Sequence, residues 1–332
     1  MLEIEDFEAV FPSGAHYTKK QVEEIRSFQS HLHGKTFFER LLDLLHINAR
    51  KAYPPPNMQQ LENLHKLITE ADIALHYKHS LLFYLLKDIS PNYYDQTDVA
   101  TAFAQNVHLE KRFWTFIEGL WALDHLQFET AVGNLTHPSI IPTFPDEIME
   151  ALLDQRNIPM GATYAEYILP MAYYNCAKPP LAHERAKIAF VRYMADRSVT
   201  DTFYWIRGRP EHEHKQLLEI LVEETLEQHS VTRNINQKYT REERAMELVN
   251  LPFDDEEEQW VEAFLTEGKG RNFHAAKDTV IMRKIATGRL SAAADDGHLR
   301  GKKHENLNWE VLKDGLRRGL GPRGDEDASF AV

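Results

Sequence analysis

Three closely spaced pairs of histidines are the residues of this chain best able to hold a metal ion. Imidazole rings about one helical turn apart can meet a single ion. None of the pairs stands in an H-E-x-x-H frame, and no set of three or four ligands is assembled around them. We therefore predict structural or surface roles for these histidines and no cofactor, and a helical metalloenzyme is a remote alternative. The pairs are His31 with His33, His76 with His79, and His212 with His214.

Catalytic groups are equally sparse. The sequence contains no G-x-S-x-G motif and no Gly-rich phosphate loop. The single cysteine, Cys176, is predicted to be an ordinary buried residue, and one cysteine alone favours a reducing compartment. The acidic run 254–258 lacks EF-hand spacing and is typical of an acid-rich first helical turn. We predict no catalytic residues and a protein that is not an enzyme.

A second kind of chemistry is contact with nucleic acid. Residues 207–210 read Arg-Gly-Arg-Pro, the core of an AT-hook, in which arginines lie in a narrow minor groove. The same residues suit a helix end, with Gly208 at the terminus and Pro210 just beyond, and we favour that interpretation. The residues kept as candidate nucleic-acid contacts are Arg207, Arg209, Lys269, Arg271, Arg283 and Lys284.

Charge is spread unevenly along the chain. The total is −13, but residues 268–324 hold 13 Lys and Arg against 6 Asp and Glu, a net of +7. Residues 325–332 carry −3, which leaves −17 for the rest. An acidic body does not attract phosphate backbones, so we expect it to bind proteins. The basic segment is predicted to be a solvated helix and tail, and a chromatin or DNA adaptor acting through it is the main alternative.

The elements that carry these residues are predicted to be helices throughout. Apolar residues recur at three and four positions, breakers are few, and no convincing strand pair is present. We predict an all-α fold, an irregular helical solenoid of roughly a dozen helices without a fixed-period repeat. Thr18 is expected to cap the first helix, a break is expected near Thr69–Asp72, and Pro170 is expected to kink or divide its helix. The expected helices are 18–28, 36–47, 58–88 in two parts, 99–107, 109–123, 125–135, 145–153, 164–175, 181–194, 199–206, 211–227, 240–251, 254–265 and 273–285.

Three segments follow from this pattern. Residues 1–16 form an acidic N-terminal segment, 17–285 the helical body, and 286–332 a mixed-charge tail expected to be partly disordered, with one amphipathic stretch at Leu307–Leu316. The acidic start has no basic region followed by an apolar run, so no secretory signal is expected. No apolar stretch approaches the roughly 18 residues needed to cross a bilayer.

The segment from Phe113 to Pro145 carries a more specific pattern. It combines Gly-Leu-Trp-x-Leu-Asp at 119–124 with His137-Pro138, and it resembles the ELYS-like domain of fungal nuclear pore assembly proteins. Upstream matches occur in the same order, and the resemblance covers about residues 30–250. These matches are FERLLDLL (38–45), YPPP (53–56), LHKLI (64–68), KHSLLFYLLKD (78–88) and TAFAQNVHL (101–109).

The resemblance implies a structural nucleoporin. It implies a helical solenoid in the Y-shaped scaffold of the outer rings, at the nuclear envelope, docked on the large propeller-plus-solenoid nucleoporin of the short arm. The animal relatives add an N-terminal β-propeller and a chromatin-binding tail with AT-hooks. No room for a propeller precedes residue 30, and the one AT-hook-like tetrapeptide lies inside the helical body, so chromatin recruitment is not expected to carry over.

The signature residues themselves suggest architectural roles. We expect Gly119 to let a neighbouring helix approach closely and Trp121 to anchor the crossing. Asp124 is expected to cap the following helix at 125–135. His137 and Pro138 are expected to set the turn into the next helix pair.

Overall fold

The computed structural model describes residues 3–48, 52–92, 98–154, 164–226, 241–273 and 275–289. The chain divides into two compact units, an N-terminal unit (Met1–Ala186) and a C-terminal unit (Lys187–Val332). The predicted boundaries after residues 16 and 285 are different ones and stay predictions. Residues 3–16 pack within the N-terminal unit, where Val10, Phe11 and Ala15 are buried. Beyond residue 289 the expected tail, including Leu307–Leu316, lies outside the described residues.

The described residues are helical and contain no strand, which confirms the predicted all-α class. Among them, no helix is both long enough and apolar enough to cross a membrane. The N-terminal unit contains α1 (Phe7–Val10), α2 (Lys19–His31), α3 (Phe37–Leu44), α4 (Met58–Glu70), α5 (Leu75–Ile89), η1 (Ser90–Asn92), α6 (Val99–Asn106), α7 (Lys111–Asp124), α8 (Phe128–Leu135), α9 (Pro145–Leu153) and α10 (Tyr164–Ala177). The C-terminal unit contains α12 (Val199–Arg207), α13 (Glu211–Leu226), α14 (Arg241–Val249), α15 (Asp255–Thr266), η3 (Lys269–Asn272) and α16 (Ala276–Ala286), and the division itself falls within α11 (Glu184–Ala195).

Local sequence explains where several helices begin. Thr18 accepts a hydrogen bond from the Gln21 backbone N–H in a capping box, which confirms the predicted start of α2. Asp254 does the same for α15, whose first turn is the acidic run 255–258 predicted from the sequence. α4 ends at Glu70 and α5 begins at Leu75, so the predicted break is confirmed. α10 continues through Pro170 as one helix, so the alternative of a division there was wrong.

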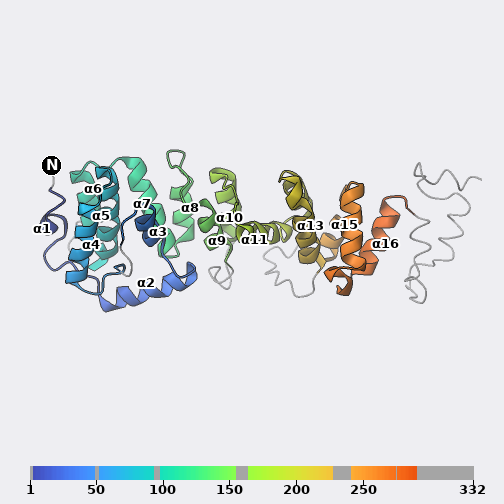
Figure 1. Cartoon of the computed structure of the whole chain (residues 1–332), viewed down its shortest axis with the longest axis horizontal. Helices are drawn as coiled ribbons and strands as arrows, with labels where there is room; N and C mark the ends of the chain where they lie inside the picture. The colour runs from blue at the N-terminus through green and yellow to red at the C-terminus, as the bar shows by residue number, and fades with distance from the viewer. Residues whose placement is uncertain are drawn as a thin grey trace, which may run out of the picture. The chain divides into compact units, whose positions relative to one another are not determined.

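In the N-terminal unit, α5 occupies the centre of the packing. All six residues from Leu81 to Leu86 are at most 1% exposed, because the helix is apolar on every side. It contacts α4, α6 and α7, which lie beside it in Figure 1. Helices adjacent in sequence pack on each other repeatedly, as in α4 with α5, α7 with α8 and α9 with α10, the pattern expected of a solenoid.

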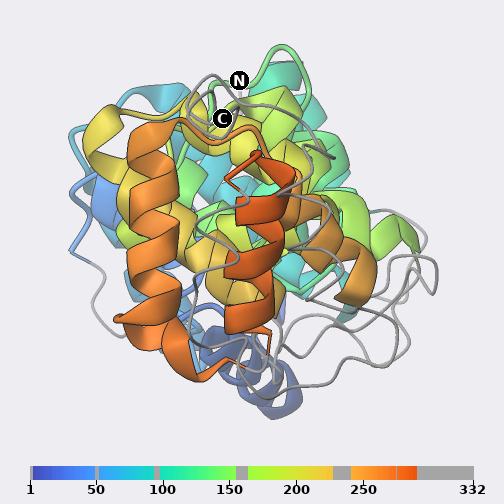
Figure 2. The same ribbon diagram turned by 90° about the vertical axis from the view of Figure 1, so that its right-hand side faces the viewer.

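The C-terminal unit has its own apolar core. Phe203, Leu221, Leu248 and Ala276, from four different helices, are completely buried in it. Here too neighbours in sequence pack together, and α15 and α16 lie side by side (Figure 2). Each unit therefore has the buried apolar cluster needed to hold its helices in register.

Candidate functional site

Two buried carboxylates lie at the centre of the N-terminal unit. Asp88, near the end of α5, is 4% exposed and Asp124, the last residue of α7, is 2% exposed. A buried aspartate needs hydrogen-bond donors, because its unpaired charge would be strongly destabilising. We call the two carboxylates and the side chains and amides that bind them the aspartate network.

Asp88 is held by three aromatic side chains. Its Oδ2 accepts from the hydroxyl of Tyr17 at 2.8 Å and from that of Tyr53 at 2.6 Å. Its Oδ1 accepts from Trp121 Nε1 at 2.7 Å, and the His125 ring lies 3.6 Å away. One carboxylate thus ties α5 to α7 and to the segments that precede α2 and α4.

Asp124 performs a different task from the one predicted. Its two oxygens accept from the backbone N–H groups of Phe37 (2.6 Å) and Phe38 (2.9 Å), the first residues of α3. The hydroxyl of Tyr84 donates to the same carboxylate at 2.7 Å. The expectation that Asp124 caps the next helix was wrong: α8 begins at Phe128, after Gln127, without a side-chain cap. The first backbone N–H groups of α3 have no acceptor within that helix. Asp124 accepts from them instead, because the C-terminal end of α7 lies next to the start of α3.

Electrostatics in this network follow from burial among neutral donors. Burial raises the pKa of Asp124 to about 7, against the opposing effect of the bonds from Phe37, Tyr84 and Phe38. Burial likewise raises the pKa of Asp88. Burial, together with the nearby carboxylates, raises the pKa of Tyr84 and Tyr53 well above 10, so both hydroxyls stay protonated and donate. The aspartate network therefore holds helices together. Each of its hydrogen-bond donors already has an acceptor within the fold.

The other signature residues surround the same place. A Cβ added at Gly119 would lie 2.7 Å from Leu135 Cγ, which is closer than real side chains approach, so α7 meets α8 where only glycine fits. Trp121 is half-buried, stacks on His125 with ring centroids 4.0 Å apart, and binds Asp88. Trp121 therefore stabilises the position of α7 in two ways, through the stacking of its ring and through the hydrogen bond of its indole N–H.

His137 and Pro138 lie on the surface, in the turn after α8. The carbonyl of His137 accepts from the backbone N–H of Ile140 at 2.9 Å, and its ring contacts Ser139 at 2.8 Å. Both residues are exposed, and Ile141 just beyond them is 80% exposed. His137 and Pro138 therefore form part of the exposed surface, whereas residues 119–124 make buried contacts.

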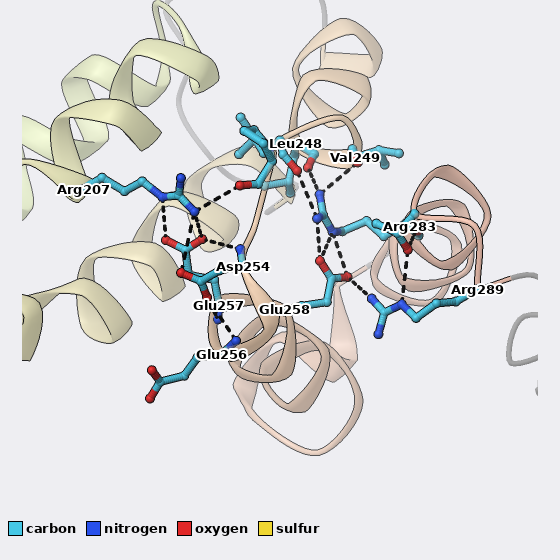
Figure 3. A network of polar contacts seen from close by, with 12 residues as sticks. Arg207, Leu248, Val249, Asp254, Glu256, Glu257, Glu258, Arg283 and Arg289 are labelled. Atoms are coloured by element: carbon cyan, nitrogen blue, oxygen red, sulfur yellow. Dashed lines mark hydrogen bonds and ion pairs between the residues drawn. The ribbon is translucent and has the colours of Figure 1, made fainter. Parts of the chain in front are cut away.

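Two of the candidate arginines of the C-terminal unit, Arg207 and Arg283, are bound within the fold (Figure 3). Arg283 is 2% exposed and its guanidinium contacts Glu258 at 2.5 Å and the carbonyls of Leu248 (2.7 Å) and Leu251 (3.1 Å). The expectation that Arg283 contacts nucleic acid was wrong, because burial removes its donors from solvent. Arg207 donates to Glu257 at 2.6 and 3.0 Å and to the Pro252 carbonyl at 3.1 Å.

The remaining candidate contacts divide into paired and exposed groups. Arg209 faces Glu213 at 3.4 Å and lies over the Trp205 ring, and Lys284 faces Glu262 at 2.8 Å. Gly208 is the C-cap of α12, as the structural interpretation of the tetrapeptide predicts. The exposed pair is Lys269 and Arg271, which both lie in η3.

Two other expectations can be placed. Within the described ranges, no three histidine, cysteine or carboxylate side chains gather as a metal site. His76 stacks on Phe113 with centroids 4.6 Å apart. Cys176 is exposed in the last turn of α10, so the predicted buried position was wrong.

The aspartate network uses residues that the sequence analysis had noted only as matching segments. Tyr53, Tyr84 and Asp88 lie in the 53–56 and 78–88 matches, but no role had been predicted for them. The signal was present, because Asp88 and Asp124 end strongly apolar helices and a carboxylate in such a place requires partners.

Comparison with known proteins places most of the described fold in one family. The family described as "ELYS: Nuclear pore complex assembly" matches residues 35–268. The Schizosaccharomyces pombe protein ely5 is 26% identical over 157 residues, covering 46% of this chain and 50% of ely5. The Xenopus laevis Protein ELYS is 22% identical over 160 residues, covering 47% of this chain and 6% of that protein. The chain thus matches half of one relative and a small part of the other.

Proposed function

Because the chain belongs to the ELYS family of nuclear pore complex assembly proteins, we propose that it is a scaffold subunit of the Y-shaped outer-ring complex. Membership implies a nuclear location, at the nuclear pore complex. The family is defined by pore assembly rather than by a reaction. The observation that carries the proposal is the extent of the match, residues 35–268, which includes both carboxylates of the aspartate network.

The proposed partner is the large propeller-plus-solenoid nucleoporin of the short arm. A scaffold subunit needs a body that keeps its shape and a surface that partners reach. The aspartate network supports the first, since it fixes α3, α5 and α7 through buried bonds. The exposed signature turn supports the second, because Ile141 is a large apolar residue left 80% exposed among exposed neighbours. We propose that its cellular role is to support pore assembly and hence nucleocytoplasmic transport.

The test is reconstitution with the purified short-arm subunits. We expect the chain to co-elute with them, to remain bound when salt screens surface charge, and to give a nuclear-rim signal in cells. Ile141→Asp should lower the affinity about tenfold, whereas Lys20→Asp, at a side chain 86% exposed and bearing charge, should not. Elution of the chain alone, together with absence from the nuclear rim, would exclude the proposal.

The alternative of a chromatin or DNA adaptor now depends on fewer residues. Of its six candidate contacts, Lys269 and Arg271 are the ones that the structure leaves exposed. Binding through them and the tail should weaken steeply with salt. If deletion of residues 268–332 leaves DNA affinity unchanged, that alternative is removed.

A further inference from the structure

The C-terminal unit contains a small pocket whose lining is partly apolar and partly cationic. It is formed by α15, η3 and α16, two helices that lie side by side in Figure 2 and the short turn between them. We call it the η3 pocket, and its volume is about 260 Å³. Buried apolar side chains come from Leu265, Val280 and Ile281. Exposed polar side chains come from Thr266, Arg271, Asn272 and Lys277.

The backbone of η3 is held closely against α15. Gly270 is buried, and a Cβ added to it would lie 2.7 Å from the ring of Phe264. Glycine therefore allows an approach that a side chain would prevent. The backbone N–H of Phe273 donates to the carbonyl of Gly270 at 3.0 Å and completes the turn. Arg271 thus extends from a backbone whose position is set by its packing on α15.

Arg271 and Lys277 differ from other cations of this unit in having no partner in the fold. Within the described residues, neither side chain has a hydrogen bond or an ion pair. By contrast, a carboxylate lies opposite each of Arg192, Arg207, Arg209, Arg244, Arg283 and Arg289. Two unpaired cations beside an apolar pocket attract a ligand that carries negative charge.

The neighbouring carboxylates do not line the pocket. Asp278 follows Lys277 on α16, so its side chain points about 100° away around the helix. Glu262 of α15 is bound by Lys284 at 2.8 Å, and that pair is neutral as a whole. Glu267 is exposed at the end of α15 and is also outside the lining. The charge that lines the η3 pocket is therefore positive.

We propose that the η3 pocket binds an acidic peptide segment of a partner protein. An aliphatic side chain of the peptide enters the pocket, and carboxylates on either side of it bind Arg271 and Lys277. A guanidinium binds a carboxylate through two parallel N–H donors, and the amide of Asn272 offers a donor and an acceptor to the peptide backbone. Small-molecule sites occupy roughly 300–1,000 Å³, so a pocket of about 260 Å³ suits a single anchoring side chain better.

Nucleic acid is the other polyanion that two cations attract, and it fits this lining less well. Single strands are held by stacking of bases on aromatic rings, and no residue that lines the pocket is aromatic. The apolar side chains of Val280 and Ile281 offer nothing to a phosphate. The inference does not depend on the proposed scaffold role, because the exposed turn at Ile141 belongs to the other unit.

The test measures the binding of defined peptides to the full chain by fluorescence anisotropy. The probe is a labelled peptide with one central leucine and two glutamates on each side of it. We expect saturable binding that weakens about tenfold when the leucine becomes alanine, and again when the glutamates become glutamines. No saturable binding, or equal affinity for the three peptides, would overturn the proposal.

Charge reversal locates the peptide on the surface. Arg271→Glu should lower the affinity about tenfold, and adding Lys277→Glu should create a preference for lysines in place of the glutamates. The matched control is Lys269→Glu, at an exposed cation of η3 that does not line the pocket, and it should change the affinity by less than about twofold. Equal losses in Arg271→Glu and Lys269→Glu would show attraction by overall charge and contradict a site in the pocket.

Filling the pocket tests its apolar part. Thr266→Trp places a large side chain in the lining and should lower the affinity about tenfold. Ala263→Trp, at an exposed position three residues earlier that does not line the pocket, should leave the affinity unchanged. Single-stranded DNA of equal charge is the competitor. If it displaces the peptide and its own binding falls equally in Arg271→Glu and Lys269→Glu, the surface is assigned to nucleic acid and the proposal is wrong.

Discussion

The two units bury carboxylates in opposite ways. In the N-terminal unit, Asp88 and Asp124 are bound by tyrosine, tryptophan and backbone groups that are neutral. In the C-terminal unit, Glu257 and Glu258 are bound by Arg207 and Arg283, so a positive charge accompanies each negative one. Neutral donors leave the pKa of the carboxylate free to rise, whereas paired charges make each partner depend on the other. The comparison predicts different responses to mutation and to pH.

The largest effect is expected for Arg283→Leu. The substitution leaves Glu258 with Arg289 alone and removes the donors to the carbonyls of Leu248 and Leu251. Breaking a buried ion pair from one side costs about 3–5 kcal/mol. Urea unfolding followed by hydrogen exchange of peptides from 241–289 measures it. Lys284→Leu, at the next residue and facing Glu262, is the control and should cost about 1 kcal/mol or less. If the two substitutions lower the free energy of unfolding equally, the buried ion pair of Arg283 contributes no more than the ion pair of Lys284. The predicted contrast between the two units would then be wrong.

Asp124→Asn should have the next largest effect. The amide keeps the shape but presents N–H groups to one of three donors, so a buried donor loses its acceptor. We expect a loss of about 3 kcal/mol in the free energy of unfolding, because a buried donor is left without an acceptor. Tyr84→Phe removes one donor to the same carboxylate and should cost about 1 kcal/mol. If the two variants are equally stable, the capping of α3 by Asp124 contributes nothing measurable.

Gly119→Ala should be smaller again, at about 2 kcal/mol, because the new methyl group would lie 2.7 Å from Leu135 and force α7 from α8. Gly133 on α8 is a matched control, since a Cβ there meets nothing within 4 Å. Gly133→Ala should be neutral or stabilising by up to about 1 kcal/mol. Thermal unfolding of both variants gives the comparison. A loss in Gly133→Ala as large as in Gly119→Ala would argue against steric contact as the cause.

Per pH unit, the smallest effect is a dependence on pH. Asp124 has a pKa of about 7 in the folded chain against 3.8 ordinarily, so the folded state binds more protons between these values. Stability therefore falls as pH rises through this window, by at most about 1.4 kcal/mol per unit for one proton, and levels off above it. Urea midpoints between about pH 5 and about pH 8 test this. In Asp124→Asn the slope should flatten; an unchanged slope would assign the titration to another group.

Local features of the fold were predictable from the sequence, and distant ones were not. Thr18 and Asp254 indicate where helices begin, because a capping residue and its helix are neighbours in the chain. Asp124 caps a helix whose first residue lies 87 positions away, and no local pattern selects that partner over α8. Arg283 looked like a surface cation because its helix is basic at that end, but its partners come from α14 and α15.

The same distinction between local features and distant partners applies to the aspartate network. The segment 119–124 identified the right place, and Gly119 and Trp121 lie at the α7 contacts. The partners Tyr17 and Tyr53 could not be selected, because they reach Asp88 from 71 and 35 residues away. Cys176 was assigned by the average burial of cysteine, which says nothing about the face of α10 on which it lies.

The distance between Asp124 and α3 also orders events during synthesis. The amide of Phe37 meets its acceptor only after 87 further residues have been added. At about 5–20 residues per second, a ribosome takes roughly 4–17 seconds to supply them. During that interval we expect water to bind the first backbone N–H groups of α3 in place of Asp124. We therefore expect the first turn of α3 to form its native hydrogen bonds late, after α7 has been synthesised and Asp124 can accept from it.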